Sequence, residues 1–169
     1  MAESVLERIA ARARQRVAED KRKNSLDMLK AHCRALGRGR GERFRAALEG
    51  PGLSFICEVK RASPSRGIIA KDFPYLEIGE DYEAAGADAI SCLTEPDWFL
   101  GSDQIFREIR GAVDTPMLRK DFTVDEYQIY QARLMGADCV LLICALLDTA
   151  AMGRYLELCD SLGLSALVE

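Results

Sequence analysis

The pattern of hydrophobic and polar residues changes character near residue 50. Before it, apolar residues recur close to every 3.6 positions, which predicts helices around residues 5–17, from residue 26 to Gly37 and over residues 43–48. After it, short apolar runs alternate with helical patterns. The expected strands are Leu53–Val59, Ala89–Leu93, Pro116–Leu118, Cys139–Ile143 and Ala166–Val168, and the expected helices are Tyr75–Ala85, Asp103–Arg110, Asp125–Leu134 and Thr149–Leu162. We therefore expect a helical extension over residues 1–50 and a series of strand–helix units over residues 51–169.

Repeated strand–helix units with short apolar strands predict a parallel sheet covered by helices. An open, doubly wound sheet and a (β/α)8 barrel both have this pattern. Neither GxGxxG nor GxxxxGK[ST], the glycine-rich loops of nucleotide-binding open sheets, occurs in the chain. Polar residues instead recur at the ends of several expected strands: Glu58 and Lys60, Thr94 and Glu95, Lys120 and Asp121, and Glu169. Barrel enzymes build their active sites in this way, so we expect a (β/α)8 barrel of which five strands are visible.

The most informative stretch is the first expected strand and the turn that follows it. Side chains alternate between the two faces of a strand, so Glu58 and Lys60 share one face near its carboxyl end. Ionised groups are rarely left in a strand that is otherwise buried, because their desolvation costs several kcal/mol. One interpretation is that Glu58 and Lys60 only neutralise each other at the end of a sheet. The interpretation that we favour is that they belong to a functional site.

Composition excludes several other classes of protein. A chain of 169 residues, 49% of them hydrophobic, can bury a full core and ordinarily forms one domain. Its six cysteines lack the spacing of zinc ligands, and several lie in apolar runs, which favours free thiols in a reducing cytoplasm. No apolar run approaches the roughly 20 residues of a membrane span, so we expect no membrane contact.

The net charge of −4 conceals an asymmetry. Residues 1–50 contain 13 Lys and Arg against 7 Asp and Glu, whereas residues 51–169 contain 10 against 20. A basic segment on an acidic body can bind nucleic acid. Here the basic residues are interspersed with acidic ones at helical spacing, without interleaved aromatic residues before Phe44. We therefore expect solvated helix faces first, contact with an anionic small substrate second, and no nucleic-acid partner.

Four motifs, in order and in spacing, resemble the indole-3-glycerol phosphate synthase family. They are Glu58-Val59-Lys60-Arg61-Ala62-Ser63-Pro64-Ser65, Leu93-Thr94-Glu95-Pro96-Asp97-Trp98-Phe99, Leu118-Arg119-Lys120-Asp121-Phe122 and Ala166-Leu167-Val168-Glu169. The resemblance covers essentially the whole chain and includes a helical N-terminal extension of the kind that this family carries. The family is a (β/α)8 barrel of roughly 250 residues, so the chain resembles its first two-thirds, through the fifth strand.

The resemblance implies a cytoplasmic carboxy-lyase of tryptophan biosynthesis. Its phosphorylated small-molecule substrate, 1-(2-carboxyphenylamino)-1-deoxyribulose 5-phosphate, would lose CO2 and water to give indole-3-glycerol phosphate, with no metal or other cofactor. By matching motif, Lys120 resembles the general acid of ring closure, and Lys60 resembles the lysine that binds anionic groups and assists dehydration. Glu58 and Glu169 resemble the partner carboxylates. The remaining assignments are substrate-binding: Ser63 in the first mobile loop, and Phe99 and Phe122 against the anthranilate ring.

Two other hypotheses remain open. The 169 residues alone could form a non-catalytic partial barrel, because the family's phosphate-binding strands seven and eight are not among the visible units. Alternatively, the chain could resemble another phosphosugar enzyme such as phosphoribosylanthranilate isomerase, although the Glu58–Lys60 strand and the Lys120 motif count against this. Because an incomplete barrel leaves strand edges unpaired, we also expect self-association of the chain or marginal folding.

Overall fold

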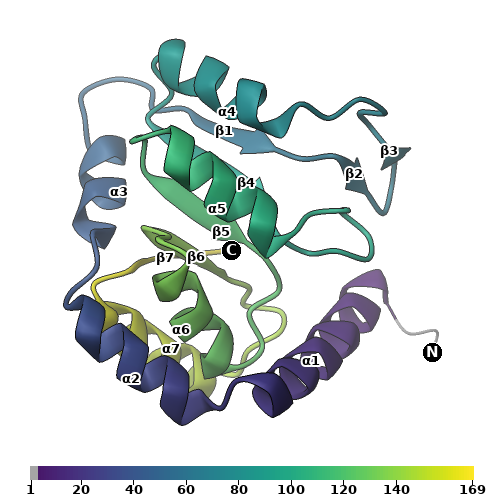
Figure 1. Cartoon of the computed structure of the whole chain (residues 1–169), viewed down its shortest axis with the longest axis vertical. Helices are drawn as coiled ribbons and strands as arrows, with labels where there is room; N and C mark the ends of the chain where they lie inside the picture. The colour runs from purple at the N-terminus through teal and green to yellow at the C-terminus, as the bar shows by residue number, and fades with distance from the viewer. Residues whose placement is uncertain (1–3) are drawn as a thin grey trace.

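The computed structural model describes residues 4–169 and contains three helices followed by alternating strands and helices (Figure 1). Residues 1–3 of the expected extension lie outside the described residues. The first helices are α1 (Val5–Lys23), α2 (Leu26–Leu36) and α3 (Gly41–Leu48). The main sheet contains β1 (Ile56–Val59), β4 (Ala89–Leu93), β5 (Met117–Lys120), β6 (Cys139–Leu142) and β7 (Ser165–Val168). Between these strands lie α4 (Tyr75–Ala84), α5 (Asp103–Ala112), α6 (Glu126–Leu134) and α7 (Thr149–Leu162).

The sheet is parallel throughout, and its strands lie side by side in the order β1-β4-β5-β6-β7, which is their order along the chain. A doubly wound sheet reverses its strand order at a switch point, and these five strands have no such reversal. The register pairs Glu58 with Ser91 and Leu93 with Lys120, which brings the carboxyl ends of neighbouring strands together. The observed fold is therefore α/β with a parallel sheet, consistent with a (β/α)8 barrel.

Alternating side chains give the sheet two distinct apolar faces. One face, which includes Ile90, Met117 and Val140, packs against the helices α4–α7 in the larger core cluster. The opposite face carries a smaller cluster built around Ala89, Leu118, Cys139 and Leu141, and Phe44 of α3 packs against it. Because Phe44 covers the residues that begin β4 and β6, the open part of this second face lies toward the carboxyl ends of the strands.

Local signals in the first 50 residues agree with the helices that form. Ser4 and Glu7 make a reciprocal capping box at the start of α1, and Ser25 caps α2 by accepting the N–H of Met28. The helix α2 ends at Gly37, whose positive φ of 68° favours glycine. Figure 1 shows α2 beside α6 and α7, at the edge of the molecule away from β1.

The structure differs from the sequence-based expectation at the first strand. β1 begins at Ile56 rather than Leu53, since the pairing with β4 begins at Ile56 and Ala89, and Phe55 bonds mainly to Asp88, the residue before β4. Its N–H donates to the Asp88 carboxylate at 2.7 Å, and its carbonyl accepts the N–H of Asp88 at 3.1 Å. After β1, the expected loop contains a short antiparallel hairpin, β2 (Ala62–Ser63) and β3 (Gly67–Ile68), which extends beyond β1 in Figure 1.

Candidate active site

A pocket of about 260 Å³ opens at the carboxyl ends of the strands, on the part of the second sheet face that Phe44 leaves open. Six of the seven residues that the sequence proposed for the site line it: Glu58, Lys60, Phe99, Lys120, Phe122 and Glu169. These residues come from the ends of β1, β5 and β7 and from the loop that follows β4. The structure thus brings together groups that are up to 111 positions apart along the chain.

Four ionic groups in this pocket alternate in charge. The Nζ atom of Lys60 lies 2.6 Å from Oε1 of Glu58, and Nζ of Lys120 lies 3.9 Å from Oε2 of the same carboxylate. Lys120 also approaches Oε2 of Glu169 at 3.7 Å. Ser91 donates a hydrogen bond to Oε2 of Glu58 at 3.3 Å. Glu58 is therefore the link between the two lysines, and acid and base groups lie within one solvent-accessible pocket.

An aromatic pair forms another wall of the pocket. The ring centroids of Phe99 and Phe122 are 6.0 Å apart and the rings are tilted by 42°. Leu93, Leu141 and Ile143 add apolar surface to the same pocket. A flat, partly charged molecule could therefore contact apolar and ionic groups at once, which is typical of small-molecule sites.

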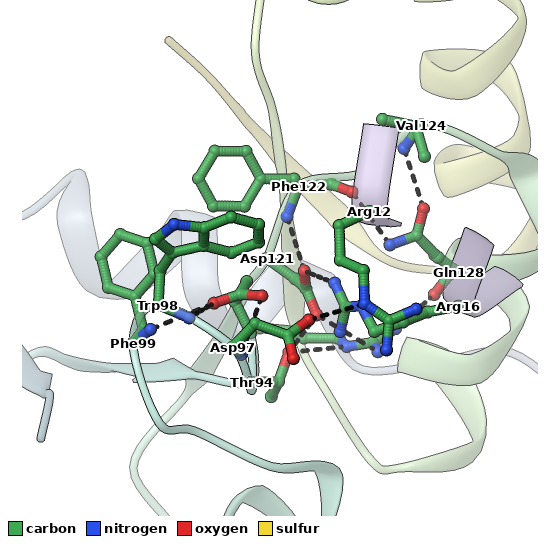
Figure 2. Close-up of polar contacts among 12 residues, drawn as sticks. Arg12, Arg16, Thr94, Asp97, Trp98, Phe99, Asp121, Phe122, Val124 and Gln128 are labelled. Carbon is green, nitrogen blue, oxygen red and sulfur yellow. Dashed lines mark hydrogen bonds and ion pairs between the residues drawn. The ribbon is translucent and has the colours of Figure 1, made fainter. Parts of the chain in front are cut away.

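The side chain of Asp121, between Lys120 and Phe122 in the chain, is 2% exposed and meets helix α1 instead of the pocket's lysines (Figure 2). Its carboxylate accepts hydrogen bonds from Arg16 at 2.9 Å and from the Thr94 hydroxyl at 2.7 Å. Burial alone would raise the pKa of Asp121. The charges of Arg119 and Arg16, together with the two hydrogen bonds, outweigh burial and lower this pKa below its ordinary value.

Two sequence-based expectations, those for Thr94 and Glu95, need correction at this point. Thr94 and Glu95 were expected at the mouth with the other strand-end residues, but they are 2% and 0% exposed and do not line the pocket. Both side chains make hydrogen bonds behind the pocket surface. The Thr94 hydroxyl donates to the Asp121 carboxylate, and the Glu95 carboxylate accepts backbone N–H groups of its own loop. Ser63 lies in β2 and outside the pocket lining, with its hydroxyl 3.5 Å from that of Ser65.

Sequence reasoning missed Ser91 and the apolar lining residues. The alternation of β4 could have found Ser91 and Leu93, since they lie two and four positions after Ala89 and therefore share its face of the strand. Ile143 and Leu141 read only as core residues in the sequence. The two-residue alternation puts both on the face of Cys139, but it does not show which residues of that face Phe44 leaves open.

Other features of the described chain do not compete with this site. A larger hollow of about 350 Å³ lies between α2, α6 and α7, and the described residues that line it include Lys30, Arg34 and Arg38 but no carboxylate. Within residues 4–169, no group of three or more His, Cys, Asp or Glu side chains is arranged to hold a metal ion. No helix of this described part is long and apolar enough to cross a membrane.

Comparison with known proteins identifies the relatives of the chain. Residues 6–169 match the family described as indole-3-glycerol phosphate synthase. A protein of that name from Ruminiclostridium cellulolyticum is 52% identical over 165 residues, which is 98% of this chain and 64% of the relative. Proteins of the same name from Endomicrobium trichonymphae and Lachnoclostridium phytofermentans are 47% and 45% identical and match 98% of this chain. The chain thus spans about two thirds of the length of these curated relatives, 64% and 65% of the last two.

Proposed function

The chain belongs to the indole-3-glycerol phosphate synthase family, and from this premise we propose that its pocket carries the acid–base groups of that lyase reaction. The observation that carries the proposal is the position of Glu58 between Lys60 and Lys120, beside the Phe99–Phe122 pair. Ring closure and dehydration need proton donors, a base and a surface for an aromatic ring in one place. This pocket contains all of them.

The reaction assigns a task to each ionic group. The ring carbon that bears the carboxylate bonds to the ketone carbon of the sugar chain, and Lys120 gives a proton to the ketone oxygen as this bond forms. Loss of CO2 returns the electron pair to the ring. The new hydroxyl then leaves as water with a proton from Lys60. A carboxylate, Glu58 or Glu169, takes the proton from the adjacent carbon, which completes the indole.

The substrate's other parts fit the remaining residues. We assign Phe99 and Phe122 to the anthranilate ring, because an aromatic pair with a tilt of 42° leaves a ring edge and a ring face available. Lys60 also attracts the anionic groups of the substrate. Ser63, in the hairpin beyond β1, is assigned to a loop that closes over the bound molecule.

For the architecture, we propose that β1, β4, β5, β6 and β7 correspond to strands one to five of a (β/α)8 barrel and that residues 1–50 form an extension folded onto it. The order of the strands and the cover of helices on one face support this assignment. We place the protein in the cytoplasm, where a biosynthetic enzyme with free thiols would be stable.

The function is tested by turnover. The purified chain, alone and extended to the length of its relatives, is incubated with 1-(2-carboxyphenylamino)-1-deoxyribulose 5-phosphate, and formation of the indole product is followed by its fluorescence. We expect turnover in the extended protein and little or none in the 169-residue chain. Absence of product in a folded, extended protein would contradict the proposal. Turnover of phosphoribosylanthranilate instead would favour the isomerase alternative.

Ion pairs between the first helices and the rest of the chain support our proposal that the protein has no nucleic-acid partner. Seven of the 13 basic residues of the first 50 positions pair with carboxylates of the acidic body: Arg12–Asp97, Arg16–Asp121, Lys21–Asp125, Lys30–Glu126, Arg38–Asp160, Arg40–Asp114 and Arg43–Asp114. Cations that already face carboxylates are less available to phosphates of a polynucleotide. The asymmetry of charge thus serves the docking of the helices α1–α3.

We expect the 169-residue chain to associate with a second copy of itself through its sheet edges. In residues 4–169 the sheet ends at β1 and β7, and apolar residues there are exposed: Leu53 by 88%, Phe55 by 61% and Val168 by 47%. Unpaired backbone beside apolar side chains favours strand pairing between chains. Sedimentation velocity at micromolar concentration should therefore show dimers or larger species.

A charged residue at the edge provides the matched comparison. Phe55→Lys should weaken the association, because a lysine immediately before the edge strand β1 opposes pairing at that edge. Met28→Lys, which changes an exposed apolar residue of α2, a helix that packs against α6, should leave it unchanged. A monodisperse monomer with a sharp, cooperative melt would show that the five strands are sufficient alone and that this expectation is wrong.

A further inference from the structure

Glu95 is a fully buried carboxylate to which the proposed reaction gives no task. It follows Thr94 at the end of β4, and it is 0% exposed. Its side-chain oxygens accept three consecutive backbone N–H groups: Asp97 at 3.1 Å, Trp98 at 2.7 Å and Phe99 at 3.1 Å. Trp98 and Phe99 of this loop are labelled in Figure 2.

This arrangement determines the shape of the whole loop after β4. The carbonyl of Glu95 accepts the N–H of Gly101 at 2.9 Å, which closes the loop on itself. Leu100 has φ of 53°, a conformation that costs energy for a residue with a side chain. A Cβ on Gly101 would lie 2.2 Å from the carbonyl oxygen of Leu93. These constraints restrict the conformation of the loop. Glu95 bonds to the loop through both its side chain and its backbone carbonyl.

The bonds of Glu95 lead directly to the pocket. Phe99, the last residue whose N–H it accepts, lines the pocket and faces Phe122. On the opposite loop Asp121 does the same for Phe122, whose N–H it accepts at 2.7 Å. Each ring of the aromatic pair is thus held at its backbone by a buried carboxylate. A hydrogen bond to a charged acceptor contributes more to stability than one between neutral groups.

We propose that Glu95 is a positioning residue for substrate binding: it sets Phe99 against Phe122 and so shapes the part of the pocket that takes the planar aromatic ring of the substrate. The substrate class rests on the function proposed above. The positioning itself rests only on the contacts of Glu95 with its loop.

The test replaces Glu95 by glutamine, which has the same shape but only one accepting oxygen. The amide nitrogen would face a backbone N–H, donor against donor, so the loop must shift. Trp98 is the only tryptophan of the chain and lies within this loop, so its fluorescence reports the shift directly. In the 169-residue chain, Glu95→Gln should move the Trp98 emission to longer wavelength and increase its quenching by acrylamide. Glu77→Gln, the same substitution at an exposed carboxylate of α4, should do neither.

Kinetics of the extended protein separate positioning from a merely structural role. Glu95→Gln should raise KM for the aromatic substrate by about tenfold, the value of one hydrogen bond to a charged group, with a smaller change in kcat. Phe99→Ala should raise KM similarly. If Glu95 acts through Phe99, the double variant should be no worse than Phe99→Ala alone, because the two effects share one ring.

Each other outcome contradicts a defined part of the inference. An unchanged Trp98 spectrum or an unchanged KM in Glu95→Gln would show that the carboxylate only stabilises the fold. Additive effects in the double variant would show that it does not act through Phe99. Should Glu95→Gln not fold, Glu95→Asp retracts the carboxylate by one methylene and permits the same comparison. If the unmodified extended protein has no turnover, the proposed function fails, and the Trp98 spectra alone decide whether Glu95 positions the loop.

Discussion

Lys120→Ala should lower kcat of the extended protein by about 10²–10⁴-fold, the range that a positioned general acid contributes. Lys120 ends β5, and its ammonium group lies between Glu58 and Glu169, where it can give a proton to a bound ketone. Its side chain is 27% exposed, and an ion pair at such a site contributes about 0–1 kcal/mol to stability. The variant should therefore fold normally.

Circular dichroism and a thermal melt verify the fold of this variant, and steady-state kinetics with the aromatic substrate measure the loss. Lys23→Ala is the matched control, because Lys23 is an exposed lysine at the end of α1, remote from the pocket lining. The control should retain full turnover. Near-normal kcat in Lys120→Ala would remove Lys120 from the mechanism and leave Lys60 as the remaining acid.

Asp121→Asn should destabilise the extended protein by about 3 kcal/mol at neutral pH, because it leaves two guanidinium groups without their buried counter-charge. Arg16 lies 2.9 Å and Arg119 3.7 Å from the Asp121 carboxylate, which is 2% exposed. Urea unfolding of the two proteins measures the difference. Asp160→Asn, which breaks the exposed pair with Arg38, should cost less than about 1 kcal/mol.

The pH dependence of this difference identifies the charge as its cause. The pKa of Asp121 is lowered in the folded protein, since burial, which would raise it, is outweighed by Arg119 and Arg16. The ionised carboxylate therefore contributes its full stability above the unfolded-state pKa of about 4, and loses it as the pH falls through the lower folded-state pKa. The gap between wild type and Asp121→Asn should shrink below about pH 4. A gap that stays constant down to pH 3 would indicate lost packing rather than lost charge.

Much of the architecture follows from local pattern. The 3.6-residue period in the first 50 residues, Ser25 before α2 and Gly37 after it predict helices that form within a few residues of their expected ends. The strand Ala89–Leu93 forms at its expected bounds. Such agreement is expected, because hydrogen bonds within a helix and the alternation of a strand depend on neighbours along the chain.

Part of the candidate site was also determined by the sequence. The two-residue period of a strand is sufficient to put Glu58 and Lys60 on one face, and they lie 2.6 Å apart. The residues at the ends of the other strands were identified by the same reasoning, and Lys120 and Glu169 reach the same pocket. Parallel strands bring their carboxyl ends to one edge of a sheet, so this grouping needs no knowledge of distances.

The tertiary structure decided which strand-end residues face the pocket. Glu95 and Asp121 follow apolar strands just as Glu58 and Lys120 do, so the hydrophobic pattern cannot distinguish them. Their direction depends on the loop backbone. The carboxylates of Glu95 and Asp121 accept the backbone N–H groups of residues 97–99 and 122, respectively. These N–H groups would otherwise be without a partner in the loop, and buried polar groups without hydrogen bonds are costly. One partner of Asp121, Arg16, comes from α1, more than 100 positions earlier in the sequence. The contact between the rings of Phe99 and Phe122 likewise depends on the register of the strands and on the conformation of the two loops. Both are properties of the whole fold rather than of any local segment.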